Sequence, residues 1–412
     1  MKVLVIGSGG REHAIVWKLS QDKKIDKIYA IPGNAGISLL AECIPIKVND
    51  IEEITNFAKK NKIDWTIVGP EVPLALGIVN LFKKEGLEIW GPIKEVARLE
   101  SSKAFAKEIM KEAKIPTADF KVFESFEDAK IFVEKEKFPL VIKADGLAAG
   151  KGVFIVNNKE EGINILEKLI KEKILGDAGE KVVIEKFLSG KEFSLIAAVK
   201  DNSIYFLPPA QDYKRVGEGN TGPNTGGMGS YAPVPWISES LIDKCKKDIF
   251  IPLINELDKR GLKYEGFLYG GLILVDGNPY VLEFNVRLGD PETQVILPLL
   301  DFSLLTFTEG FKDFKVNNKK AVCVVLASKG YPDKYEVEKE IKIENGDDSI
   351  IFHAGTTLKN GKLVTSGGRV LNIVSIADSF KDAKDKVYKK IQKIYFDGIY
   401  YRKDIAEEVS NF

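Results

Sequence analysis

Short apolar runs alternate with charged, amphipathic stretches over the first hundred residues. The runs at 3–6, 28–31, 66–68 and 87–90 each have the length of a buried strand, and the stretches between them have helical spacing. Strands that alternate with helices in this way form a parallel sheet with helices on both faces. The pattern therefore predicts a doubly wound α/β domain at the start of the chain.

A glycine-rich turn follows the first predicted strand and opens the first helix, with the sequence Gly7-Ser8-Gly9-Gly10. Such a turn allows N–H groups at a helix N-terminus to face an anion. A dinucleotide site would also need an acidic residue about 20 positions further on to hold a ribose. The second strand ends instead in Pro32-Gly33-Asn34-Ala35-Gly36, so NAD is disfavoured and a sugar phosphate fits better.

Between about 103 and 190 the sequence pattern changes to strands joined by short turns, which predicts a separate lid-like unit. A strand at 139–146, a small-residue loop at 147–152 and a strand at 153–156 form a hairpin. The loop is not a Walker A motif, because it is one residue short, lacks Ser or Thr after Lys151 and leads to a strand. An ordinary hairpin is the alternative to our interpretation, a glycine loop that brings N–H groups and Lys151 over a polyphosphate, with Lys143 on the preceding strand. The strand at 182–188 then leads to a hinge that suits an adenine and its ribose.

Residues 279–287 have strand periodicity, which places Glu283, Asn285 and Arg287 on one face and apolar residues on the other. A carboxylate and an amide oxygen on a rigid strand form a partial Mg²⁺ site that phosphate oxygens and water would complete. Arg287 suits bidentate binding of a phosphate. A solvent-facing strand is the alternative, but the acids Asp290 and Glu292 follow at once and favour a site.

Residues 211–229 form the other dense patch of polar and glycine residues. Six glycines lie between 217 and 229, and Lys214, Arg215, Asn224 and Thr225 are mixed with them. Because long loops without structure are rarely idle, we expect a substrate loop here in preference to a linker. We expect the chain to return from this loop into a hydrophobic helix.

Composition excludes several classes of protein. Lys and Arg together number 60, as do Asp and Glu, so no basic excess favours a nucleic-acid partner. The three cysteines are far apart, which fits buried thiols in a reducing cytosol better than disulfides or a metal site. No signal peptide and no apolar run of membrane-spanning length is expected, so the pattern favours a cytoplasmic enzyme of two to four domains.

The motifs occur in a fixed order that covers the whole chain. The segments are 7–14, 32–36, 69–71, 142–152, 211–229, 283–294 with its core Gly-Asp-Pro-Glu-Thr-Gln, 352–356 and 367–370. In these motifs the chain resembles the glycinamide ribonucleotide synthetases, a family of ATP-grasp ligases. It departs from the family at Tyr213, where His is usual, and at Leu288, where Phe is common. We expect both departures to be peripheral to the chemistry.

The resemblance implies a multidomain α/β and α+β fold. It consists of a doubly wound N-terminal α/β domain at 1–102, a central ATP-grasp domain at 103–121 and 189–320, a lid at 122–188 and a small C-terminal α/β domain at 321–412. ATP is expected between the lid and the central domain. Its implied contacts are Lys103, Lys143, Gly150, Lys151, Gly152, Glu185, Lys186, Leu188 and Glu192.

The resemblance also implies sites for metal and substrates. Glu283 and Asn285 would hold Mg²⁺ or Mn²⁺. Phosphoribosylamine and glycine would be bound by Gly9, Gly10, Asn34, Gly36, Glu71, Lys214, Asn224, Thr225, Gly226, Arg287 and Glu292. Arg287, Asp212 and Asp290 are the catalytic candidates. If a base assists the amine, the candidates are Asp212, Asp290 and Glu292, and the sequence does not choose among them.

The implied reaction joins glycine to 5-phosphoribosylamine with ATP through a glycyl phosphate, as a step of purine synthesis. We expect a monomer that acts on these two small molecules. Because His13 and His353 are the only histidines, a histidine-centred acid–base mechanism is not favoured. We expect His13 to shape the first helix and His353 to support domain packing. An NAD-dependent oxidoreductase, a nucleotide-binding protein that has lost catalysis, and another ATP-grasp ligase or carboxylase remain as alternatives.

Overall fold

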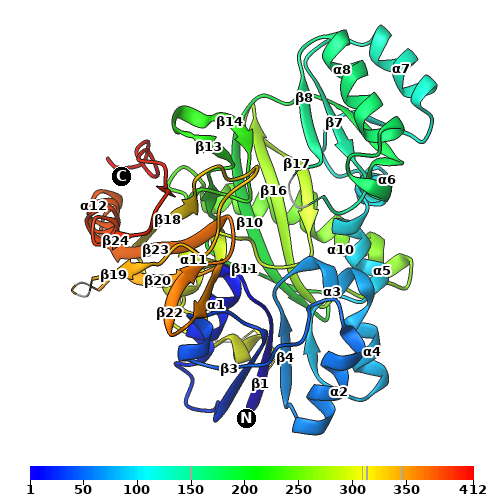
Figure 1. The fold of residues 1–412 in the computed structure, drawn as a ribbon. Helices are drawn as coiled ribbons and strands as arrows, with labels where there is room; N and C mark the ends of the chain where they lie inside the picture. Colours follow the sequence, from blue (N-terminus) through cyan, green and yellow to red (C-terminus); the bar gives the residue numbers. More distant parts are fainter. Residues whose placement is uncertain (149–150, 309, 312–313, 345, 347) are drawn as a thin grey trace.

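The computed structural model describes residues 1–148, 151–308, 310–311, 314–344, 346 and 348–412. The N-terminal unit is a five-stranded parallel sheet of order β3-β2-β1-β4-β5, with its strands at Lys2–Gly7 (β1), Lys27–Pro32 (β2), Glu42–Cys43 (β3), Trp65–Val68 (β4) and Ile89–Trp90 (β5). Its helices are α1 (Gly10–Leu19), α2 (Ile51–Asn61), α3 (Glu71–Leu76) and α4 (Ile78–Lys84). This unit lies at the bottom of Figure 1, and it confirms the predicted doubly wound domain.

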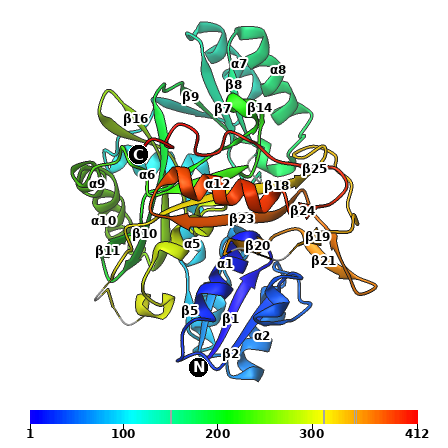
Figure 2. The same cartoon turned by 90° about the vertical axis from the view of Figure 1, so that its left-hand side faces the viewer.

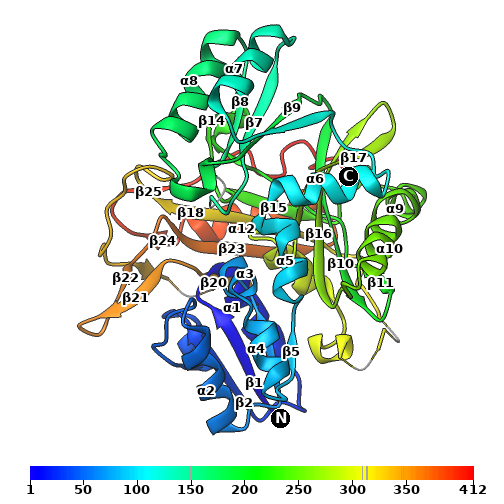
Figure 3. The same ribbon diagram turned by 90° about the vertical axis from the view of Figure 1, so that its right-hand side faces the viewer.

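The lid is a small antiparallel sheet with two helices on one face. Its strand order is β6-β9-β7-β8, from Phe120–Phe123 (β6), Leu140–Ala144 (β7), Val153–Val156 (β8) and Val182–Lys186 (β9). Helices α7 (Phe126–Lys135) and α8 (Lys159–Leu166) bury Ala129, Val133 and Leu166 against this sheet. Figure 3 shows the lid at the far end of the molecule from the N-terminus. The predicted hairpin at 139–156 is therefore confirmed.

The central unit supplies the floor of the molecule below the lid. Its antiparallel sheet has the order β11-β10-β16-β17, from Lys191–Lys200 (β10), Ser203–Phe206 (β11), Gly266–Val275 (β16) and Asn278–Asn285 (β17). The helices α5 (Lys94–Ser101), α6 (Lys103–Glu112), α9 (Glu239–Cys245) and α10 (Ile251–Lys259) surround it. Strand β17 confirms the strand predicted there, with Phe284 buried in the core and Glu283 and Asn285 lining the cleft. A bulge between Val281 and Glu283 interrupts the alternation, so Val281 is buried while the apolar Leu282 lines the cleft.

The C-terminal unit is built on an antiparallel sheet of order β12-β15-β18-β23-β20, to which β25 adds beside β18. Figure 2 shows α12 (Phe380–Ile391) lying along the long strand β23. The strands are Gln211–Asp212 (β12), Gly229–Ala232 (β15), Lys320–Ser328 (β18), Ile350–His353 (β20), Arg369–Ala377 (β23) and Ile399–Tyr400 (β25). Four shorter strands form two ribbons, β19 (Lys342–Ile343) with β24 (Ile394–Tyr395) and β21 (Thr356–Lys359) with β22 (Lys362–Thr365).

Two strands of this last sheet come from the predicted substrate loop. The loop contains a hairpin of β13 (Arg215–Gly217) and β14 (Thr221–Asn224), and it then enters strand β15. The expectation of a hydrophobic helix after the loop is therefore wrong. Residues 229–232 pair with β18, about 90 positions later, and this partner cannot be read from the local pattern.

The units share buried cores. One core joins the N-terminal sheet to the central and C-terminal units through residues such as Val5, Trp90, Phe307 and Cys323. Cys245 and Cys323 are buried as expected, Cys43 is half-buried, and all three are free thiols. Among the described residues, no helix has the length and apolar character that crossing a membrane requires.

Candidate active site

A cleft of about 1000 Å³ lies where the four units meet. The predicted site residues that line it are Glu71, Lys103, Lys143, Gly152, Glu185, Lys186, Leu188, Glu192, Asp212, Lys214, Asn224, Thr225, Gly226, Glu283, Asn285, Arg287, Asp290 and Glu292. Other predicted residues lie outside its lining, namely Gly9, Gly10, Asn34, Gly36 and Lys151. Gly150 is outside the described residues.

Strand β17 places the two predicted metal ligands on the cleft side. Among the described residues, no side-chain hydrogen bond engages the Glu283 carboxylate or the Asn285 amide, so their oxygens are free for a cation. Burial alone would raise the pKa of Glu283, but Lys214 and other nearby cations hold that pKa below its ordinary value. An ionised carboxylate beside an amide oxygen suits Mg²⁺ or Mn²⁺, provided that phosphate oxygens and water complete the shell. In the described part of the chain, no cluster of three or more His, Cys, Asp or Glu residues offers an alternative metal site.

A buried group of ion pairs holds Lys143 of strand β7 in the lid. The Nζ atoms of Lys143 and Lys107 lie 3.0 and 3.1 Å from the same oxygen of Glu185. Lys143 also donates to the Leu282 carbonyl on β17 at 2.9 Å, and Lys107 donates to Thr117 Oγ1 at 2.6 Å. Glu185 thus joins the lid to helix α6, and it fixes Lys143 close to β17.

Lys107 was not predicted from the sequence. Burial lowers its pKa to about 8, although Glu185 opposes that shift. It lies four residues after Lys103 on α6, and this i, i+4 spacing puts both lysines on one helix face. That spacing was the signal available in the sequence. Lys103 itself donates to the Gly146 carbonyl of the lid at 3.3 Å, so α6 contacts both the lid and the cleft.

Arg287 is paired with two acids of the segment before the lid. Its Nη2 lies 2.8 Å from Glu100 Oε1, and its Nε lies 3.5 Å from Glu71 Oε2. Glu100, which the sequence reasoning missed, also accepts from the Val286 N–H at 2.8 Å. These carboxylates raise the pKa of Arg287, although burial alone would lower it. The guanidinium is oriented across the cleft floor, between the N-terminal and central units.

A second acidic group lies beneath the substrate loop. Glu292 Oε1 accepts from Ser194 Oγ at 2.9 Å and from the Tyr269 hydroxyl at 3.0 Å, two residues that the sequence reasoning missed. Asp212 has no side-chain hydrogen bond among the described residues. Burial and the neighbouring carboxylates raise the pKa of Asp212 to about 7, against the effect of Lys214. Lys214 lies 3.0 Å from Glu192 and is the main cation of this group.

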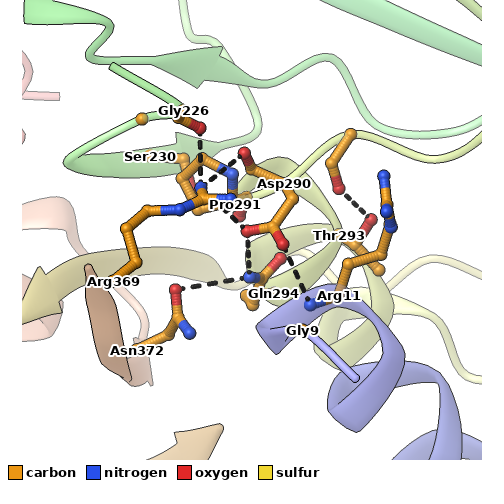
Figure 4. Close-up of polar contacts among 12 residues, drawn as sticks. Gly9, Arg11, Gly226, Ser230, Asp290, Pro291, Thr293, Gln294, Arg369 and Asn372 are labelled. Atoms are coloured by element: carbon orange, nitrogen blue, oxygen red, sulfur yellow. Dashed lines mark hydrogen bonds and ion pairs between the residues drawn. The ribbon is translucent and has the colours of Figure 1, made fainter. Parts of the chain in front are cut away.

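Asp290 occupies a junction between units, and Figure 4 shows its contacts. Its Oδ1 accepts from Gln294 Nε2 at 2.8 Å and lies 3.1 Å from Arg369 Nη1, while its Oδ2 faces the Arg11 N–H at 3.4 Å. Burial would raise the pKa of Asp290, but Arg369 and Arg11 hold that pKa below its ordinary value. The Asp290 carboxylate is therefore committed to structural contacts and is a poor candidate for a base.

The predicted phosphate turn at the start of α1 is engaged by protein groups. Gly9 N donates to Glu12 Oε2 at 2.5 Å. The Asn34 amide donates to the carbonyls of Ser8 at 2.8 Å and His353 at 2.9 Å. These contacts tie the two predicted glycine turns to the C-terminal unit. His13 Nδ1 accepts from the His353 N–H at 2.8 Å, so His353 supports the packing of units as expected, and His13 on α1 takes part in the same contact.

The lid loop reaches the C-terminal unit as well as the cleft. Ala148 and Gly152 line the cleft, whereas Lys151 Nζ donates to the Pro332 carbonyl at 3.1 Å. The Lys151 side chain therefore contacts the C-terminal unit and does not line the cleft. Gly146 packs against Ala178, so the hairpin turn rests on the lid's own loop.

One protein family matches the chain along its length. The matches are the N domain of phosphoribosylglycinamide synthetase over residues 1–100, its ATP-grasp (A) domain over 101–293 and its C domain over 321–408. A phosphoribosylamine–glycine ligase of Caldanaerobacter subterraneus subsp. tengcongensis is 50% identical over 414 aligned residues, covering 98% of this chain and 99% of that protein.

Solved structures also match the chain over most of its length. The crystal structure of a phosphoribosylamine–glycine ligase from Thermotoga maritima matches with a TM-score of 0.87 and 40% identity, covering 98% of this chain and 100% of that one. At the level of fold alone, a biotin carboxylase of Campylobacter jejuni matches with a TM-score of 0.75 and 14% identity, over 97% of this chain and 92% of that one. The resemblance expected from the motifs is confirmed, and the chain belongs to the phosphoribosylglycinamide synthetase family.

Proposed function

We propose that this protein joins glycine to 5-phosphoribosylamine at the expense of ATP. The products are glycinamide ribonucleotide, ADP and phosphate, in a step of de novo purine synthesis. The proposal includes action in the cytoplasm as a monomer.

One observation carries the proposal. Lys103, Lys143 and Lys214 come from three different segments and converge on Glu283, whose pKa they lower together. Three cations beside a carboxylate and an amide suit the transfer of a phosphoryl group, which needs positioning and charge neutralisation more than covalent help from the protein. The remaining lining residues of the lid and hinge, including Glu185, Lys186, Leu188 and Glu192, would hold the nucleotide.

The Glu283 carboxylate and the Asn285 amide are the proposed ligands of Mg²⁺ or Mn²⁺. When bound, the metal would act as a Lewis acid that neutralises charge on the transferring phosphoryl group. Glu283 and Asn285 lie on one rigid strand, so the protein's contribution is to fix the spacing of two oxygen ligands.

The proposed reaction has two steps. An oxygen of the glycine carboxylate attacks the γ-phosphorus of ATP, and ADP leaves. The nitrogen of phosphoribosylamine then attacks the carbonyl carbon of glycyl phosphate, and phosphate leaves with the bridging oxygen. The amine loses a proton to a base, for which Asp212 is our candidate because its carboxylate lines the cleft and has no side-chain hydrogen bond among the described residues. The lid would exclude water from the acyl phosphate.

The two remaining substrates would bind on either side of β17. The part of the cleft next to the substrate loop, where we propose that glycine binds, is lined by Glu292, Lys214, Asn224, Thr225 and Gly226. Arg287 and Glu71 line the side of the N-terminal unit, where we propose that phosphoribosylamine binds. Gly9, Gly10, Asn34 and Gly36 remain our proposal for the phosphate end of that substrate, which requires them to exchange their present protein contacts.

An omission experiment tests the function. Release of phosphate should require ATP, Mg²⁺, glycine and phosphoribosylamine together, with the amine generated in the assay because it is unstable. Comparable phosphate release with glycine left out would reject the assignment. Glu283→Gln in the complete mixture is the matched control for contaminating ATPase activity.

A further inference from the structure

The 400–412 segment packs across the hairpin of the substrate loop. Figure 1 shows the β13–β14 hairpin and the C-terminus on the same side of the molecule. Both segments line the cleft, the hairpin through Arg215, Asn220 and Asn224 and the 400–412 segment through Glu408 and Val409. The wall of the cleft on this side is thus made by two segments almost 200 positions apart.

Arg402 connects the two segments. It is 1% exposed, and its guanidinium donates to the Arg215 carbonyl at 3.1 Å and to Asn220 Oδ1 at 3.0 Å. Asp404 holds the other side of the guanidinium with contacts of 2.8 and 2.6 Å. Asp404 Oδ2 also accepts from the Gly219 N–H at 2.8 Å. The tip of the hairpin is therefore held by an ion pair of the 400–412 segment in which the arginine is buried and the aspartate is half-buried.

Tyr213 holds the base of the hairpin to the same segment. Its hydroxyl donates to Glu408 Oε1 at 2.6 Å and accepts from the Ala406 N–H at 2.8 Å. The side chain is 4% exposed, and the Arg402 guanidinium lies 4.9 Å from the centre of its ring. The hydroxyl is the atom that reaches the 400–412 segment.

Lys214 follows Tyr213 directly and points the other way, into the cleft. Its Nζ lies 3.0 Å from Glu192 Oε2, and Lys214 and Glu283 both line the cleft. Its carbonyl accepts from the Thr225 N–H at 2.7 Å, which closes the base of the hairpin. The backbone that positions Lys214 is thus held on one side by Thr225 and on the other by Tyr213.

We propose that the 400–412 segment is a clasp that fixes the substrate loop and thereby holds Lys214 in the cleft beside β17. Tyr213 and Arg402 are its positioning residues. The catalytic consequence rests on the function proposed above, in which Lys214 serves phosphoryl transfer, whereas the mechanical consequence does not. Release of the clasp should loosen residues 214–225 and slow turnover, while the contacts of ATP with the lid and hinge stay intact.

The test compares single-atom changes in two buried tyrosines. Tyr213→Phe removes the clasp hydroxyl, and Tyr264→Phe removes a buried hydroxyl that donates to the Phe267 carbonyl in the core of the central unit. Loss of hydrogen bonds that involve a charged acceptor should speed amide exchange in 214–225 by about tenfold. We expect kcat to fall on the order of tenfold with KM for ATP within about twofold. Tyr264→Phe should leave the exchange of 214–225 and kcat unchanged.

A second pair of variants separates positioning from general loss of structure. Glu408→Gln keeps a neutral oxygen acceptor for Tyr213 and should fall between the wild type and Tyr213→Phe, whereas Glu408→Ala should reproduce Tyr213→Phe. Wild-type exchange at 214–225 in Tyr213→Phe would overturn the clasp, and faster exchange with unchanged kcat would overturn its role in positioning Lys214 for turnover. The exchange measurement uses the free enzyme without substrates, so it decides whether the clasp exists even if the omission experiment rejects the proposed function.

Discussion

At position 283 a carboxylate lies among cations that arrive from the lid, from helix α6 and from the substrate loop. Its lowered pKa shows that the site is built to keep it ionised despite burial. The charge of that carboxylate, more than its volume, should therefore determine how the site performs. A neutral side chain of the same shape tests this directly.

Glu283→Gln should lower kcat by a factor of 100 or more while the protein stays folded, because it removes charge at the metal with little change in volume. Steady-state kinetics over a wide range of Mg²⁺ concentrations, with a thermal melt, provide the measurement. Glu265→Gln, which changes a surface acid that pairs with Lys83, is the matched control and should leave kcat intact. Turnover near the wild-type value at saturating Mg²⁺ would reject the metal role.

Asp212 and Asp290 should respond differently to the same change. Asp290→Asn removes the charge partner of Arg369 at a partly buried junction, so the free energy of unfolding should fall by about 1–3 kcal/mol with turnover largely retained. Asp212→Asn should retain stability and lose turnover by a factor of about 100 or more. Denaturant melts and kcat for both variants decide the matter. The opposite pattern, an inactive but stable Asp290→Asn, would make Asp290 the base.

Single residues were predictable where the motif and the strand period agreed. Glu283, Asn285 and Arg287 follow from the alternation along one strand, and Lys143 follows from the hairpin. Glu100, Ser194 and Tyr269 could not be predicted, because each lies in an apolar or ordinary helical context and gains its role only from a partner far along the chain. Arg402 was missed for the same reason.

At the scale of elements, local periodicity was sufficient for the N-terminal sheet, the lid hairpin and β17. It failed after the substrate loop, where β15 forms by pairing with β18. Four residues that include Gly229 and Ala232 have no strong propensity of their own, so tertiary pairing decided their structure. The same long-range pairing makes the loop part of the C-terminal sheet.

The packing of α1 on β20 predicts a pH effect. Burial, with the charge of His353, lowers the pKa of His13 to about 3, and burial lowers the pKa of His353 to about 4. Unfolded histidines titrate near 6.5, so below that pH the unfolded state binds more protons and stability falls. Between pH 6.5 and 5 the loss should be roughly 2–4 kcal/mol, and stability from this source is complete above about pH 6.5.

Nuclear magnetic resonance measures this pair directly, because the chain has two histidines. Both Cε1–H signals should stay at their neutral positions from pH 7 to 5, and His353→Gln assigns them. A titration midpoint near 6.5 for either signal would show that the α1–β20 contact is open in solution.

At the scale of the whole molecule, the cleft is formed only when all four units are assembled. Glu185 joins the lid to α6, Arg287 joins the central unit to Glu71 and Glu100, and Asp290 joins three units at once. Separate units would each carry part of the site. The order of motifs along the chain predicted such an assembly, but only the structure gives the pairings across it.

The central claim is that glycine is activated by phosphorylation, and transfer of labelled oxygen tests it most directly. Glycine carrying ¹⁸O in both carboxylate oxygens should pass one labelled oxygen to each phosphate released, because the carboxylate oxygen that attacks the γ-phosphorus leaves with it. The other labelled oxygen should remain in the amide. Mass spectrometry of phosphate and product gives both numbers in one reaction. Unlabelled phosphate formed in step with product, with its oxygen from water, would contradict the mechanism.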